Sequence, residues 1–146
     1  MRRVVTVERS VEIARPAPDV FAYLSDLERL PEWQSTVSEV RVEGPVAEGA
    51  RMHDVREFMG RRAATTLEVS RHDPPRRLSL RVVDGPVKYE IDHVLTESGG
   101  RTRVEVAARA NVPGMFGFAA RPMLKAAERQ LAADLERLKQ VLEAAS

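Results

Sequence analysis

Apolar and polar positions alternate along most of this chain, beginning near its N-terminus. In the stretch "VVTVERSVEI", Val5, Val7, Val11 and Ile13 fall on one side of a two-residue repeat. Strict alternation of this kind predicts a half-buried β-strand. The next stretch, "ARPAPDVFAYL", opens with prolines and an Asp that suit a first helical turn, and "SDLERL" continues helical spacing. We therefore predict one strand followed by two short helices.

The two-residue repeat resumes at Val37 and continues to Ala110. It is interrupted only by stretches rich in turn residues, which read "EGPVAEG", "MGR", "HDPPRR", "DGP" and "SGGR". Short turns between consecutive strands join neighbours in an antiparallel sheet. The pattern predicts six further strands arranged as a meander.

Two of these turns predict which side chains face the core. A two-residue turn at Asp84-Gly85 places Leu80 opposite Tyr89. A second turn, at Gly99-Gly100, places His93 on the same face, because directly opposed residues share a face of a sheet. The same alternation, applied to the preceding strand, places Thr65 and Leu67 on that face as well. The predicted inner face holds Thr65, Leu67, Leu80, Tyr89, Ile91, His93, Leu95 and Val106.

The strand around residues 51–59 has two possible registers. A two-residue turn near Gly60 would place inside the residues Met52, Asp54, Arg56 and Phe58. A longer turn would instead place inside the residues His53, Val55, Glu57 and Met59. Both sets mix apolar and charged side chains, so the alternation alone does not choose between them.

The C-terminal part of the chain predicts one long helix. Leu124, Leu131 and Leu138 recur every seven residues with alanines between them, which gives one apolar stripe. A helix from about Pro122 to Ala144 would be about 35 Å long, enough to cross a sheet. The preceding stretch, "VPGMFGFAARP", is a poor regular helix, and we interpret it as a mobile apolar cover.

These elements predict an α+β fold. A seven-stranded antiparallel sheet with one apolar face must bury that face, and only the C-terminal helix is long enough to cover it. We expect the sheet to wrap around this helix, with two short helices after the first strand. The length of 146 residues fits one domain, residues 1–146.

Composition narrows the classes of function. The chain has no Cys, and its three His residues show no paired ligand spacing, so we expect no metal or cofactor. Its 23 basic and 22 acidic residues are interleaved, which argues against a nucleic-acid-binding stripe. No apolar run is long enough for a membrane span or a signal peptide, so we expect a cytoplasmic location.

Four segments in this order resemble the START-like (SRPBCC) helix-grip superfamily, and in particular its polyketide cyclase/dehydrase-like branch. They read "VEIARPAPDVFAYLSDLERLPEW", "VSRHDPPRRLSLRV", "HVLTESGGRTRVEV" and "LERLKQVLE". The resemblance implies a cavity between sheet and helix that binds a lipid, polyketide or isoprenoid-like molecule. It equally allows an enzyme of the cyclase, aromatase or dehydratase type, or an interaction module, because fold does not determine function.

The predicted ligand-lining residues combine the inner face, the cover and the single tryptophan. Trp33 is predicted to be either a core residue or a residue at the mouth of the cavity. The second interpretation comes from the resemblance, since a Trp at a similar place helps to shape the pocket in related aromatase/cyclases. Tyr89 and His93 are the candidate proton-transfer groups, and Arg56 depends on the undecided register. The full set is Trp33, Arg56, Phe58, Thr65, Leu80, Tyr89, Ile91, His93, Val106, Met115, Phe118 and Met123. The expected partner is a small hydrophobic molecule, and a homodimer is left open.

Overall fold

The computed structural model describes residues 2–113 and 117–145, and its elements follow the predicted order. After β1 (Arg2–Ile13) come α1 (Ala17–Leu24), the 3-10 turn η1 (Leu27–Arg29) and α2 (Leu30–Trp33). The remaining elements are β2 (Val37–Glu43), β3 (Arg51–Phe58), β4 (Arg61–Asp73), β5 (Arg77–Asp84), β6 (Tyr89–Ser98), β7 (Arg101–Pro113) and α3 (Gly117–Ala144).

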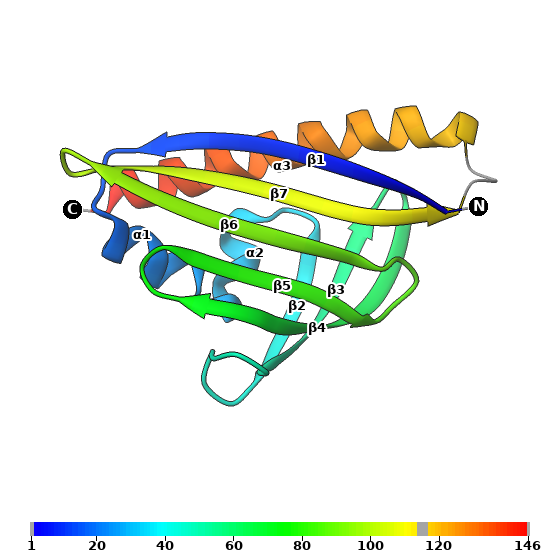
Figure 1. Ribbon diagram of the computed structural model, residues 1–146, viewed down its shortest axis with the longest axis horizontal. Coiled ribbons are helices and arrows are strands. Elements are labelled where there is room, and N and C mark those ends of the chain that lie inside the picture. The colour runs from blue at the N-terminus through cyan, green and yellow to red at the C-terminus, as the bar shows by residue number, and fades with distance from the viewer. Residues whose placement is uncertain (1, 114–116, 146) are drawn as a thin grey trace.

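The seven strands form one antiparallel sheet in the order β1-β7-β6-β5-β4-β3-β2. The sheet curves around its inner face, and α3 runs alongside β1 across the top of the molecule in Figure 1. This is the predicted α+β helix-grip fold. No helix in the ranges 2–113 and 117–145 has the length and apolar character needed to cross a membrane.

The β6–β7 hairpin has the predicted register, because His93 pairs with Val106 across the Gly99-Gly100 turn. The β5–β6 hairpin does not. Leu80 pairs with Ile91 rather than with Tyr89, since the connection is longer than a two-residue turn at Asp84-Gly85. The error moves the pairing by two residues. It therefore leaves every side chain on its predicted face.

The undecided strand takes the first of its two registers. Asp54 pairs with Thr65 and Arg56 with Ala63, around a two-residue turn at Met59-Gly60. Met52 and Asp54 are buried, and Arg56 and Phe58 lie on the same inner face. The tight turn thus brings a charged pair into the interior.

Helix α3 begins at Gly117, earlier than the predicted start near Pro122. The prediction failed because a proline inside a helix was read as a boundary, whereas here Pro122 lies within the first two turns. Its 28 residues give α3 a length of about 42 Å. Leu135, Leu138 and Leu142 of α3 are buried, so the C-terminal half of the helix forms part of the core.

Candidate functional site

The inner face of the sheet is buried at one end of the molecule and only half-buried at the other. On β3, β4, β6 and β7, the burial of the inner-face residues falls toward the same end. On β6, Leu95 and His93 are buried, whereas Ile91 and Tyr89 are partly exposed. The partly exposed inner-face residues toward this end are Val5, Arg56, Phe58, Ala63, Tyr89, Ile91, Ala108 and Ala110. Because they come from five strands, we call this end the open end.

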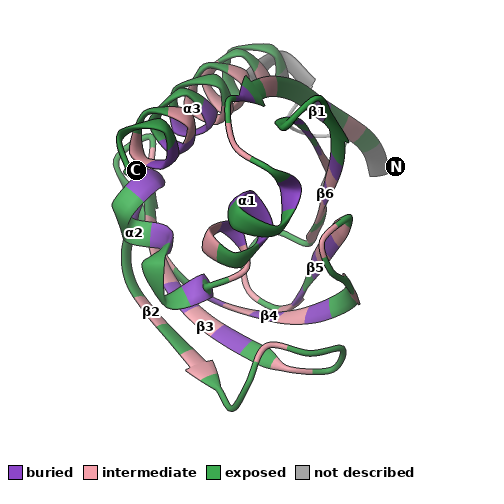
Figure 2. Ribbon diagram, turned by 90° about the vertical axis from the view of Figure 1, so that its left-hand side faces the viewer, coloured by how far each residue is buried: buried purple, intermediate pink, exposed green. Residues whose placement is uncertain are grey.

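The other end is closed by α1, η1 and α2. Figure 2 looks at this end and shows α1 inside the ring formed by the sheet and α3. Val20 and Leu24 of α1 are buried in one cluster with Leu138 of α3. The apolar side chains of the two short helices therefore fill the interior at this end of the fold. In the described part of the chain, the open end has no such helices.

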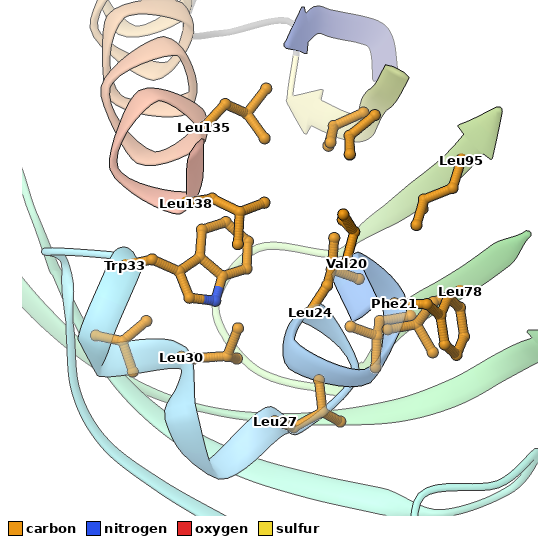
Figure 3. Packing of buried hydrophobic residues seen from close by; sticks show 14 of the residues in the cluster. Val20, Phe21, Leu24, Leu27, Leu30, Trp33, Leu78, Leu95, Leu135 and Leu138 are labelled. Carbon is orange, nitrogen blue, oxygen red and sulfur yellow. The ribbon is translucent and has the colours of Figure 1, made fainter. Parts of the chain in front are cut away.

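Trp33, at the end of α2, belongs to this buried cluster. Its side chain lies beside Leu138, with Leu30 and Leu135 nearby (Figure 3), and the residue is 3% exposed. The core role foreseen for Trp33 is therefore what the structure shows. Contact with a ligand stays a prediction.

The indole of Trp33 leaves one polar atom without a partner. Its Nε1 is buried, and no hydrogen-bond acceptor for it lies within the described part of the chain. The neighbouring residue, Gln34, is also buried, and its Oε1 atom is likewise unpartnered among those residues. A buried polar atom without a hydrogen bond is costly, so each of these two atoms would gain from a hydrogen-bonding partner.

Arg56 and Asp54 form an ion pair on the inner face of β3. Nε of Arg56 donates to Oδ2 of Asp54 at 2.8 Å, while Oδ1 of Asp54 has no partner within residues 2–113 and 117–145. The Asp54 side chain is completely buried, whereas that of Arg56 keeps 27% of its surface exposed. The terminal nitrogens of Arg56 make no hydrogen bond to any described residue, so they remain available as donors.

Helix α3 adds a second carboxyl group to this interior. Asp134 is buried and accepts a hydrogen bond from Nε2 of Gln130 at 2.8 Å, and the backbone of Ser35 lies close to its carboxylate. Burial raises the pKa of Asp134, although these contacts and the charge of Arg56 oppose the effect. Gln130 also donates to Oγ of Ser35 at 2.9 Å, which ties α3 to the end of α2.

Tyr89 lies on the same face as this group, on β6. Burial raises the pKa of its phenol, and the nearby charge of Arg56 opposes this effect while Asp54 adds to it. Burial alone would lower the pKa of Arg56, but the charge of the Asp54 carboxylate and its hydrogen bond outweigh this and hold that pKa above its ordinary value. The guanidinium is therefore a permanent charge beside a neutral phenol.

His93 has the inward orientation that the sequence predicted. Its Nδ1 is 3.0 Å from the carbonyl oxygen of Leu78, and the residue is 4% exposed. Burial lowers the pKa of His93, so the ring is neutral and Nδ1–H donates to that carbonyl. This arrangement orients Nε2 as the acceptor of the ring.

The structure brings together only some of the predicted lining residues. Arg56, Phe58, Tyr89 and Ile91 lie on the partly exposed inner face, whereas Thr65, Leu80, His93 and Val106 are buried. Met123 is 37% exposed, on the first turns of α3. Met115 lies outside the described residues, and only the backbone of Phe118, in α3, is described. Whether these residues contact a ligand stays a prediction.

Sequence reasoning missed Asp134 and Gln34. A signal for Asp134 was present, because it lies three residues after Leu131 and four before Leu138, on the apolar stripe of α3. Gln34 has no comparable signal, since it follows a helix of only four residues. The inward position of Arg56 was predicted by only one of the two registers left open for its strand.

The convex face offers little for an apolar ligand. Two shallow hollows, of about 220 and 380 Å³, are lined mainly by charged or polar residues. In the first, Arg77 and Ser79 both donate to Asp92, which satisfies that carboxylate. Across the described residues, no three His, Asp or Glu side chains come together in a way that could hold a metal ion.

Known proteins share this fold over nearly the whole chain. The profile of the family described as "Polyketide cyclase / dehydrase and lipid transport" matches residues 4–143. An uncharacterized protein of Mycobacterium tuberculosis is 29% identical over 148 residues, covering 96% of this chain and 98% of that protein.

Solved structures are similar as well. TTHA0849 from Thermus thermophilus has a TM-score of 0.85 at 23% identity, covering 97% of this chain and 99% of its own. The Zhui aromatase/cyclase from Streptomyces sp. R1128 has a TM-score of 0.77 at 21% identity, covering 97% and 94%. A START superfamily protein from Mycobacterium smegmatis has a TM-score of 0.70 at 19% identity, covering 95% and 94%. At these identities the likeness concerns the fold.

Proposed function

Since the chain belongs to the polyketide cyclase/dehydrase and lipid transport family, we propose that it binds a small hydrophobic molecule between the sheet and α3. The observation that carries this proposal is the half-buried inner face at the open end. Apolar surface that stays in contact with water forgoes about 25 cal/mol per Å² of stabilisation. A ligand lying along Phe58, Tyr89 and Ile91 would recover part of that energy.

The polar groups of the interior constrain the polar end of the ligand. Trp33 Nε1 is an unpartnered donor, whereas Gln34 Oε1 and Asp54 Oδ1 are unpartnered acceptors among the described residues. A molecule that satisfies both kinds must itself carry a donor and an acceptor. A hydroxyl group is both a donor and an acceptor, and a molecule that has hydroxyl and carbonyl groups offers both functions at separate positions.

The charges favour a neutral polar end. Two carboxyl groups, Asp54 and Asp134, lie near one interior cation, Arg56. The raised pKa of Asp134 indicates that this environment disfavours a further negative charge. A fatty acid carboxylate would add such a charge, whereas an alcohol or ketone would not. The ligand class is therefore a neutral oxygenated hydrocarbon, such as a hydroxylated polyketide or isoprenoid.

Displacement of an environment-sensitive apolar dye tests the proposal with three molecules of equal chain length. We expect a long-chain alcohol and its methyl ketone to displace the dye with saturation at pH 7.5, and the corresponding carboxylate to displace it more weakly. Arg56→Met should weaken the binding of the alcohol. Arg103→Met, on the convex face, should leave that binding unchanged. Absence of saturable binding by all three molecules would refute ligand binding, and preference for the carboxylate would refute the neutral class.

A cyclase or dehydratase reaction in the same interior is the second candidate. The observation in its favour is the inward Arg56 beside Tyr89, since a charge next to a phenol can stabilise an enolate and position a proton donor. Product analysis with a poly-β-ketone substrate tests it. If a conversion is found, the Tyr89→Phe, His93→Phe double variant should lose it, and unchanged turnover would exclude these residues as proton-transfer groups.

A further inference from the structure

The exposed large apolar side chains gather on segments at one end of the molecule. Among the described residues they are Val4, Met59, Val87 and Met123, with exposed fractions of 65%, 58%, 45% and 37%. They lie at the start of β1, in the β3–β4 turn, in the β5–β6 loop and in the first turns of α3. In Figure 1 these segments lie toward the right-hand side, opposite α1.

Backbone contacts connect two of these segments directly. Val4 pairs with Asn111 of β7, and the N–H of Asn111 donates to the carbonyl of Lys88 at 3.3 Å, next to Val87. The same end carries the partly exposed inner face, because Tyr89 follows Val87 by two residues and Phe58 directly precedes Met59. The exposed side chains of Met59, Val87 and Met123 therefore lie on segments at the open end, whereas Val4, which alternates with inward-facing Val5, lies on the convex side of β1.

The conformation of Met59 is unfavourable for its residue type. Met59 has φ 53° and Gly60 has φ 77°, so both occupy the left-handed region, as in a type I′ hairpin turn. Asn is the common residue at the first position of such a turn, and Met has no local hydrogen bond to offer there. The exposed Met59 side chain gains little packing in return, so the isolated protein offers no benefit that explains it.

Positive charges accompany these apolar side chains. Arg61 follows Met59, Lys88 follows Val87, and Arg121 and Lys125 flank Met123. All four cations are exposed, and none forms an ion pair with a described residue. At the closed end, the helical segment 17–33 contains four acidic residues and one Arg. The open end thus combines protruding apolar side chains with unpaired positive charge.

From this arrangement we propose that the open end docks on an anionic lipid surface. Apolar side chains that protrude from turns can enter the region between headgroups and acyl chains, while Arg and Lys beside them meet lipid phosphates. A second copy of this chain fits the surface poorly, because like charges would face each other. Docking would place the interior against the phase in which an apolar ligand dissolves, but it does not depend on ligand binding.

Co-sedimentation with vesicles tests the proposal. We expect the protein to bind vesicles of phosphatidylcholine and phosphatidylglycerol in equal parts, and to be released by high salt. Vesicles of phosphatidylcholine alone should bind it much more weakly. Arg61→Gln and Lys125→Gln should each reduce the partition coefficient about fivefold, which corresponds to about 1 kcal/mol per cation. Arg29→Gln, which removes a cation at the closed end, is the matched control and should have no effect.

A second pair of variants separates docking from folding. Met59→Asn suits the turn, so it should fold at least as well as the parent protein while reducing vesicle binding several-fold. Val87→Thr should act in the same direction with unchanged folding. Equal binding to both kinds of vesicle, equal loss in the Arg29→Gln control, or absence of binding would overturn the proposal. A dimer in gel filtration that Met59→Asn dissociates would overturn it in favour of a second copy.

Discussion

Arg56 and Asp54 lie two residues apart on β3 and form an ion pair inside the fold, with 2.8 Å between Nε and Oδ2. Alternation places both side chains on one face of the strand, and the tight Met59-Gly60 turn decides that this face is the inner one. A charge brought inside in this way depends on its partner, because either group alone would be a buried, uncompensated ion.

Loss of one partner should be more harmful than loss of both. We predict that Arg56→Met lowers the free energy of unfolding by on the order of 3 kcal/mol, because it leaves the Asp54 carboxylate without its ion pair. The double variant Arg56→Met, Asp54→Leu should recover most of that loss. Urea denaturation of the two single variants and the double variant measures the coupling. Additive effects of the two substitutions would contradict a direct interaction.

Asp134 should make stability fall as pH rises. Its pKa in the folded protein is raised above the ordinary value of 3.8, so the folded state holds a proton that the unfolded state has already lost. The stabilising contribution is complete below pH 3.8 and disappears as pH rises through the folded pKa. We predict that Asp134→Asn, which can still accept from Gln130, increases the free energy of unfolding at pH 7 relative to the parent protein.

The advantage of Asp134→Asn should shrink as pH approaches 3.8, where the parent carboxyl is protonated in both states. Chemical denaturation at several pH values measures it. Glu143→Gln is a suitable control, because its hydrogen bonds with Lys139 and the backbone of Ala14 lower the pKa of that carboxyl. Its effect on stability should therefore have the opposite dependence on pH.

His93 should have its own signature at mildly acidic pH. Burial lowers its pKa below the ordinary value of 6.5, so the unfolded state takes up a proton first. The stability that depends on neutral His93 is complete above pH 6.5 and is lost as pH falls through the folded pKa. We predict that an NMR titration of the His93 ring has its midpoint below pH 6.5. A ring that titrates at 6.5 or above would contradict its burial.

Met59→Asn should stabilise the protein. Asn is better suited than Met to the left-handed backbone at this position, where Met59 has φ 53°. We predict a gain of roughly 0.5 to 1 kcal/mol in the free energy of unfolding. Thermal and urea denaturation measure it, with Met123→Asn, in the regular backbone of α3, as the comparison. A gain of equal size in Met123→Asn would show that removal of an exposed apolar side chain, rather than the backbone, is the cause.

The sequence by itself determined the order of elements and the two faces of the sheet. The two-residue repeat of apolar positions in strands and the helical repeat in helices are local properties of the chain. The inward orientation of Tyr89 and His93 followed from the two-residue repeat. The exact pairing of β5 with β6 did not follow, because a loop longer by two residues gives the same alternation and the same faces. The predicted start of α3 was wrong for a related reason, since a proline such as Pro122 is compatible with either the first two turns of a helix or a boundary.

Only the tertiary structure decided the polar interior. The alternation allowed either Arg56 or His53 inside, because both sets of side chains mix apolar and charged residues. The folded chain surrounds Arg56 with partners, namely Asp54 on the same strand, Tyr89 on β6 and Asp134 on α3. A charged residue is stable in a core only where such partners converge, and that convergence is a property of the folded chain. The same holds for the apolar residues of the open end, which are far apart in sequence and meet only when the sheet closes around α3.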